Sequence, residues 1–222
     1  MSFGIFLYFE VLSLLIAVFC ATRKRNNLLL YFIPFLFLTV FIEMIGTSDL
    51  ASLKGIRFAI YNLFTSFEFI FYFFLFYSNL KTKSLKKIIL YIIPLFIFSV
   101  SINLSFIQGL NKTFHTYTFL LGSFFIVIFC CFFFFESVLP EKIDTQLSKQ
   151  PFFWISTGLL IYYLGSVIIN ALFEYLTNNA LKLEGQRIYG IINNSLIVIL
   201  YSSYSIAFFL CPDNKKKSSS QL

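Results

Sequence analysis

Charged residues are scarce in this sequence. Asp, Glu, Lys and Arg make up only 12% of the 222 residues, whereas apolar residues make up 59%. A soluble domain needs about a quarter of its residues charged to cover its surface. The composition therefore excludes a soluble domain and indicates a protein of the membrane.

The sequence also lacks the residue patterns of most enzymes. It contains a single histidine, His115, and has no H-E-x-x-H, G-x-S-x-G or glycine-rich phosphate loop. No pair of aspartates lies within an apolar stretch, and the last apolar stretch has no lysine that could hold retinal as a Schiff base. We therefore expect no enzymatic activity, no cofactor and no metal site, and we expect the four cysteines to be free thiols.

Acidic residues are outnumbered, which gives a net charge of +7. Basic residues that flank membrane helices act as topology signals. No soluble basic face exists to hold nucleic acid, so we expect no nucleic-acid partner.

Long apolar runs dominate what is present. A membrane-spanning helix needs about 20 apolar residues. The sequence predicts an all-α, polytopic membrane protein, a bundle of seven transmembrane helices over residues 1–211, followed by a disordered cytoplasmic tail over 212–222. The predicted helices span about residues 3–21, 28–47, 57–79, 88–106, 114–135, 152–176 and 188–211.

The basic residues are divided unequally between the two sides of the predicted membrane. One side has 12 of the 17 Lys and Arg residues, and the other side has the remaining five, which are Lys54, Arg57, Lys112, Lys182 and Arg187. Because the side richer in Lys and Arg faces the cytoplasm, we predict an outside N-terminus and a cytoplasmic C-terminus.

One carboxylate is predicted to lie deep in the membrane. Glu68 follows Arg57 by 11 residues, or roughly 16 Å at 1.5 Å per residue, close to the middle of a ~30 Å apolar core. A charge there costs about 2.5–3.5 kcal/mol. We expect Glu68 to face protein or trapped water in a functional site. The alternative is a structural hydrogen bond to a tyrosine or an asparagine.

Polar residues form stripes at helical spacing on three predicted helices. The stripes contain Tyr61, Thr65, Glu68 and Tyr72, then Tyr162, Ser166, Asn170 and Glu174, then Arg187, Asn194 and Tyr201. If these stripes faced one another, they would build a polar pocket open to the outside. The alternative is that the asparagines and serines only join helices by hydrogen bonds.

Four segments resemble a known family. They are YNLFTSFEF (61–69), HTYTFLL (115–121), KQPFFWISTGLLIYYLG (149–165) and INNSLIVILYSSYSIAF (192–208). In this order they are similar to an uncharacterised family of small seven-transmembrane-helix bacterial membrane proteins, often encoded near sensor histidine kinases. The resemblance implies a fold and a signalling context, and no reaction. It points to Glu43, Tyr61, Asn62, Glu68, Tyr117, Trp154, Gly158, Asn193 and Tyr201.

The first functional hypothesis is a non-enzymatic sensor or accessory signalling subunit in the bacterial cytoplasmic (inner) membrane. Its partners would be the lipid bilayer and a membrane histidine kinase or another signalling protein. The alternative is a small-solute or proton-coupled transporter. The candidate ligand-binding residues are Glu10, Glu43, Tyr61, Asn62, Glu68, Asn170, Asn193, Asn194 and Tyr201.

Overall fold

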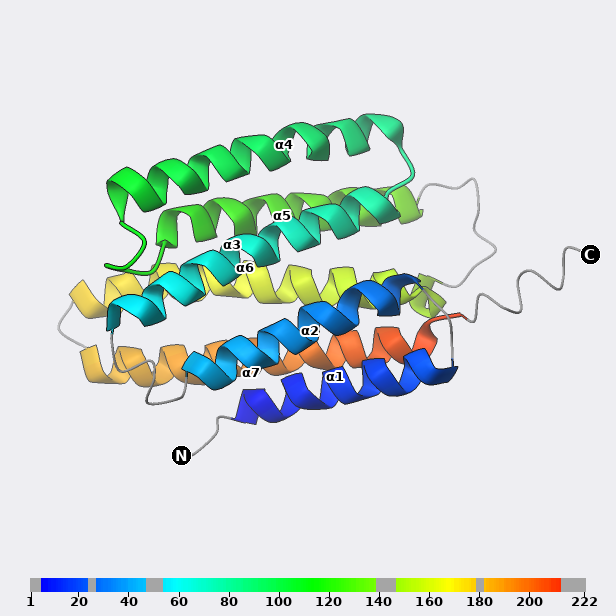
Figure 1. Ribbon diagram of the computed structural model, residues 1–222, viewed down its shortest axis with the longest axis horizontal. Helices are drawn as coiled ribbons and strands as arrows, with labels where there is room; N and C mark the ends of the chain where they lie inside the picture. The colour runs from blue at the N-terminus through cyan, green and yellow to red at the C-terminus, as the bar shows by residue number, and fades with distance from the viewer. Residues whose placement is uncertain (1–4, 24–26, 47–53, 139–146, 179–181, 213–222) are drawn as a thin grey trace, which may run out of the picture. The chain divides into compact units, whose positions relative to one another are not determined.

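The protein is helical throughout the residues whose structure is described. The computed structural model describes residues 5–23, 27–46, 54–138, 147–178 and 182–212, and no strand occurs among them. Seven of its helices are long and apolar enough to cross a membrane (Figure 1). The predicted fold class is therefore confirmed, and the chain is that of an integral membrane protein.

The helices follow one another through short connections. They are α1 (Ile5–Arg23), α2 (Asn27–Gly46), α3 (Lys54–Asn79), α4 (Lys83–Ile102), the π-helical turn η2 (Asn103–Ile107), α5 (Thr116–Val138), the 3-10 turn η4 (Leu147–Lys149), α6 (Pro151–Asn178) and α7 (Lys182–Leu210). The predicted cytoplasmic tail lies outside the described residues, except for Pro212.

Two helices begin well before their apolar stretches. Helix α4 begins at Lys83, five residues before the predicted start, and α7 begins at Lys182, six residues before it. Lysine and arginine are good helix formers, so a basic segment can continue the helix beyond the apolar core. Hydropathy locates the part of a helix that lipid surrounds, and this part is shorter than the helix itself.

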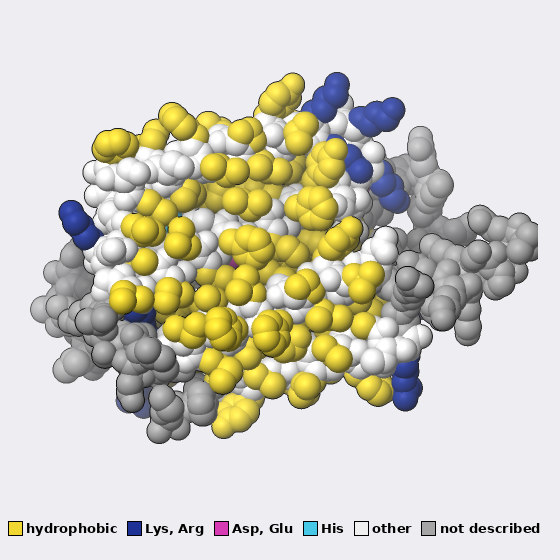
Figure 2. Space-filling view, in the orientation of Figure 1, with side chains coloured by type: hydrophobic (Ala, Val, Ile, Leu, Met, Phe, Trp, Pro, Cys, Tyr) yellow, Lys and Arg dark blue, Asp and Glu magenta, His cyan; other side chains and the backbone are white. Residues whose placement is uncertain are grey.

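Lipid contact explains the surface of these helices. Each of the seven has exposed large apolar side chains, such as Leu12 on α1, Phe37 on α2 and Phe124 on α5. Figure 2 shows hydrophobic side chains over much of one face, with Lys and Arg side chains near the helix ends. Acyl chains solvate such a surface without penalty, whereas large apolar patches on a soluble monomer are rare.

The chain divides into two compact units. Unit 1 comprises Met1–Phe41 and Ile143–Leu222, and unit 2 comprises Ile42–Lys142. Helix α2 therefore contributes most of its length to unit 1 and its last turn to unit 2.

Unit 1 is organised around α7, which packs against α6 and α1 (Figure 1). Two glycines of α6 allow the close approach of α7. A Cβ atom at Gly158 would lie 2.8 Å from Ser203 Cβ, and one at Gly165 would lie 2.7 Å from a Leu196 methyl carbon. Small residues at helix contacts are the usual means of close packing in membranes.

The start of α6 is fixed by the only tryptophan of the chain. Trp154 is half-buried, and its indole N–H donates a hydrogen bond across 2.9 Å to the carbonyl oxygen of Ser148 in η4. The hydrogen bond ties the first turn of α6 to the preceding turn.

Unit 2 has a core of phenylalanine rings from α3, α4 and α5. Phe73 lies edge-on to Phe96 and Phe129, with ring centroids 5.3 Å apart in both pairs. Phe69 fits against α5 only because residue 122 is glycine, since a Cβ atom there would lie 2.7 Å from the Phe69 ring. Phenylalanine rings therefore fill the interior of unit 2 around Phe73.

A carboxylate from α5 caps the start of α4. Glu136 accepts hydrogen bonds from the backbone N–H groups of Lys81 and Thr82, at 2.8 and 2.7 Å. Thr82, the residue before the first turn, makes no capping hydrogen bond with its own side chain. Glu136 thus satisfies donors that a helix leaves unpaired at its N-terminus.

Candidate functional site

The sequence-predicted site residues divide between the two units. Glu43, Tyr61, Asn62 and Glu68 belong to unit 2, whereas Glu10, Asn170, Asn193, Asn194 and Tyr201 belong to unit 1. A single pocket built from both sets stays a prediction.

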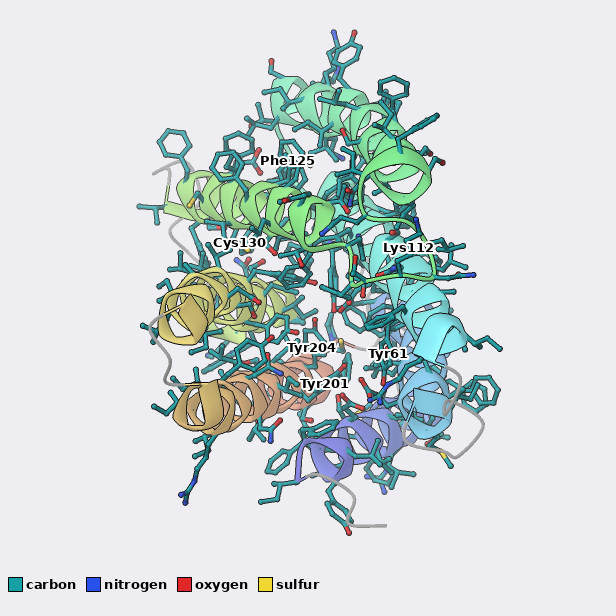
Figure 3. The ribbon with its side chains drawn as sticks, turned by 90° about the vertical axis from the view of Figure 1, so that its left-hand side faces the viewer. Tyr61, Lys112, Phe125, Cys130, Tyr201 and Tyr204 are labelled. Carbon is teal, nitrogen blue, oxygen red and sulfur yellow. The ribbon has the colours of Figure 1, made fainter. Side chains whose placement is uncertain are left out.

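Unit 2 gathers polar side chains at one end, which we call the polar end. There α2 ends, α3 begins, η2 follows α4 and α5 begins. Figure 3 views the side on which this end lies, with Tyr61 and Lys112 labelled. Two hydrogen-bonded clusters lie here.

The first cluster contains a carboxylate, a phenol and a guanidinium group. Tyr61 Oη donates a hydrogen bond to Glu43 Oε2 across 3.1 Å. The guanidinium carbon of Arg57 lies 5.9 Å from the centroid of the Tyr61 ring, within the range of a cation–π contact. Glu43 and Tyr61 are half-buried and Arg57 is exposed. We call these three residues the Glu43 cluster.

A glycine makes room for this cluster. Gly46 is buried in the last turn of α2. A Cβ atom at Gly46 would overlap the hydroxyl oxygen of Tyr61 and lie 2.7 Å from the ring carbon that bears it. The position of the Tyr61 hydroxyl beside Glu43 therefore requires glycine at residue 46.

The second cluster is centred on Asn62, which is fully buried. Its Nδ2 donates hydrogen bonds to the carbonyl oxygens of Leu110 and Thr113, both at 2.9 Å. Its Oδ1 accepts a hydrogen bond from the backbone N–H of His115 at 3.1 Å. One side chain of α3 thus holds the loop between η2 and α5 by three backbone contacts, which we call the Asn62 latch.

His115 lies beside the latch and is also fully buried. Its Nδ1 is 2.6 Å from Thr118 Oγ1, and Thr118 Oγ1 accepts a hydrogen bond from Asn103 Nδ2 at 3.1 Å. Within the described part of the chain, His115 Nε2 has no hydrogen-bond partner. Burial lowers the pKa of His115 to about 4, so the imidazole is neutral at pH 7.

The π-helical turn brings Asn103 into this cluster. The carbonyl oxygen of Asn103 accepts a hydrogen bond from the N–H of Gln108, five residues later, at 2.9 Å. The side chain of Asn103 also donates to Gln108 Oε1 at 2.8 Å. Gly109 then takes a φ of +75°, a backbone conformation that side-chain-bearing residues rarely adopt. Single π-helical turns occur often at functional sites.

Glu68 lies further along α3. It is half-buried, and its Oε1 accepts a hydrogen bond from the hydroxyl of Tyr72, one turn later, at 3.0 Å. The contact matches the structural alternative that the sequence left open, a hydrogen bond to a tyrosine. A ligand-binding role for Glu68 stays a prediction.

The candidate residues of unit 1 differ in burial. Glu10 and Tyr201 are buried, Asn170 and Asn193 are half-buried, and Asn194 is exposed. Asn170 Nδ2 donates to the carbonyl oxygen of Ser166 on its own helix at 2.7 Å. Tyr201 packs edge-on against Tyr204, with ring centroids 5.6 Å apart (Figure 3). Their roles in binding stay predictions, and the side chain of Glu174 lies outside the described residues.

Several residues of the polar end are absent from the sequence-based set. The loop is held by Asn103, Gln108, Thr118 and His115. The sequence signal that could have indicated them was the polar composition of residues 108–118. Among the described residues, no group of three or more His, Cys, Asp or Glu side chains is placed to hold a metal ion.

Comparison with other proteins gives no relative. No protein-family model, curated protein or solved structure matches the chain.

Proposed function

We propose that this integral membrane protein is a non-enzymatic sensor or accessory signalling subunit, with a stimulus that acts at the polar end of unit 2. The observation that carries the proposal is the one-sided placement of polar groups in that unit. The Glu43 cluster and the Asn62 latch lie at one end, and the phenylalanine core fills the region beyond. Such an arrangement suits recognition on one side of a membrane.

The Glu43 cluster is the proposed recognition site. Glu43 on α2 offers a hydrogen-bond acceptor, and α3 offers a phenol and an exposed cation one turn apart. A ligand that took up either charged group would compete for the hydrogen bond between Glu43 and Tyr61. Because Tyr61 and Asn62 are adjacent in α3, a shift of Tyr61 is expected to reach the latch.

The proposed setting follows from the sequence. The resemblance to small bacterial membrane proteins and the distribution of Lys and Arg support a place in a bacterial cytoplasmic membrane, with the polar end outside. The same resemblance supports a membrane histidine kinase as the partner. The short connections between the described helices leave little other surface for a signal, so a partner within the membrane fits the proposal best.

The experiment is a comparison of histidine phosphorylation in native membranes that contain or lack the chain. Tyr61→Phe removes the hydroxyl that bonds Glu43, and Tyr91→Phe is the matched control because Tyr91 is 74% exposed on α4. We expect loss of the chain and Tyr61→Phe to change the phosphorylation of the same kinase. The proposal fails if loss of the chain leaves every phosphorylated histidine kinase unchanged.

A small-solute or proton-coupled transporter is the second candidate, because of Glu68. A half-buried carboxylate that is hydrogen-bonded to a tyrosine could relay a proton. The phenylalanine rings packed around Phe73 carry no polar group that could continue such a path. If proteoliposomes that contain the protein take up solute or protons, and Glu68→Gln abolishes this uptake, the proposed function changes from sensor to transporter.

A further inference from the structure

His115 occupies an environment that suits only the neutral form of its side chain. Every side chain of the polar end that bonds to it or to its backbone is uncharged, namely Thr118 from α5 and Asn62 from α3. Asn103 from η2 reaches it through Thr118. The imidazole is fully buried among these groups.

The hydrogen bonds around Thr118 provide an acceptor for one imidazole proton of His115 but not for a second. Thr118 Oγ1 contacts His115 Nδ1, the carbonyl oxygen of His115 at 3.2 Å and Asn103 Nδ2. If Nδ1 carries the proton, Thr118 accepts from both nitrogens and donates to the carbonyl, which satisfies all three groups. A second proton would then sit on Nε2, which has no partner among the described residues. A buried N–H without an acceptor is costly, and a buried charge costs more.

Among the described residues, no acidic side chain is hydrogen-bonded to the His115 ring. The charged and titratable groups of the surrounding elements are Lys54, Arg57, Tyr61, Glu68, Tyr72 and Tyr77 on α3, Lys112 in the loop, and Tyr117, Cys130, Cys131 and Glu136 on α5. Of the two acids among them, Glu68 accepts from Tyr72, and Glu136 accepts from the backbone N–H groups of Lys81 and Thr82. Glu43 accepts from Tyr61 instead. Burial alone accounts for the lowered pKa of His115, with no contribution from a neighbouring charge.

The side chain of His115 is coupled to the latch through its own backbone. The N–H of His115 donates to Asn62 Oδ1, and the carbonyl oxygen of His115 accepts from Thr118. A charged imidazole can reach water only if residue 115 moves. That movement breaks the bond to Asn62, and the loop then loses one of its three contacts with α3.

We propose that His115 is a proton-binding site, and that its protonation opens the Asn62 latch and releases the loop of residues 108–115 from α3. The inference rests on the proposed function for its use, since it makes acid a stimulus at the polar end in addition to a ligand of the Glu43 cluster. The latch itself can be tested without any signalling partner.

The first measurement is a titration of the imidazole. His115 is the only histidine, so protein with isotopically labelled histidine in lipid nanodiscs gives one set of imidazole NMR signals. We expect a neutral ring down to pH 5 and titration near pH 4. Titration near pH 6.5, the ordinary value for histidine, would overturn the inference.

The second measurement is hydrogen exchange of the backbone amides of residues 110–115, corrected for the intrinsic effect of pH. Closing the latch excludes one proton, so the protection of these amides should fall about tenfold per pH unit between pH 6.5 and 4. In His115→Gln, which cannot titrate, protection should not depend on pH. In Asn62→Ala, the latch should be open at every pH and the amides should exchange rapidly.

The outcomes separate the latch from the sensor. Equal protection at pH 7 and pH 4 in the wild type overturns the latch, as does an acid-induced loss that persists in His115→Gln. If His115→Gln does not fold, the titration of the wild type still decides. If acid opens the latch but loss of the chain leaves kinase phosphorylation unchanged, the latch stands and only the proposed function is refuted.

Discussion

The contact between Gly46 and Tyr61 gives a sharp test of the Glu43 cluster. In Gly46→Ala the added Cβ atom occupies the place of the Tyr61 hydroxyl, so the ring must move and the hydrogen bond to Glu43 must break. A hydrogen bond to a charged group contributes about 1.5–3 kcal/mol, and alanine regains about 0.5–1 kcal/mol of helix propensity. We expect a net loss of about 1–2 kcal/mol in the free energy of unfolding.

A double-mutant cycle isolates this cause. Tyr61→Phe removes the hydroxyl that the methyl group displaces, so Gly46→Ala should cost less in that background, by about 1.5 kcal/mol. The cost does not vanish, because the terminal ring carbon still lies within 2.7 Å of the added atom. The measurement is reversible unfolding in bicelles or mixed micelles. Gly190→Ala is the matched control, since no atom lies within 4 Å of a Cβ at Gly190, and it should be neutral or stabilising.

Additive effects of Gly46→Ala and Tyr61→Phe would refute the role of Gly46 in the Glu43 cluster. Independent sites add within about 0.3–0.5 kcal/mol. If Gly46→Ala costs the same in the presence and absence of the Tyr61 hydroxyl, the glycine does not position the phenol.

The remaining predictions concern the latch and the core of unit 2. Asn62→Ala leaves the carbonyl groups of Leu110 and Thr113 and the N–H of His115 without the side chain that bonds them. At about 1 kcal/mol for each hydrogen bond, it should lower the unfolding free energy by about 3 kcal/mol. Asn111→Ala, at an exposed position of the same loop, should change it by less than about 0.5 kcal/mol. Gly122→Ala forces the Phe69 ring aside and should cost about 1–3 kcal/mol, again with Gly190→Ala as the control in the same unfolding assay. Because burial lowers the pKa of His115 to about 4, the neutral ring stabilises the fold fully above pH 6.5, and this contribution is lost as the pH falls towards 4. The unfolding free energy should drop by up to about 3 kcal/mol over that range, and a pH profile unchanged by His115→Gln would contradict this.

The helices could be predicted from the sequence because the bilayer constrains them so strongly. A chain in lipid must satisfy its backbone polar groups internally and must span about 30 Å, so apolar length alone locates α1 to α7. The starts of α4 and α7 were not predicted, because the thickness of the bilayer does not limit how far a helix continues beyond the apolar core.

The candidate site was less predictable, because helical spacing tells which residues share a face and not what that face contacts. Tyr61 and Glu43 were both candidates, yet their contact depends on the glycine at residue 46. Asn62 was a candidate by resemblance, and its partners are backbone groups of a loop whose path no periodicity describes. Asn194 shares a predicted stripe with Tyr201 but is exposed where Tyr201 is buried.

The hydrogen bond between Trp154 and Ser148 makes the indole a native optical reporter of unit 1. No other tryptophan contributes to the emission, and separation of η4 from α6 would break the bond and shift the fluorescence. The lone imidazole signal reports on unit 2 in the same way. Recording both signals while the unmodified protein is heated or denatured would therefore reveal whether the two units unfold together or one after the other.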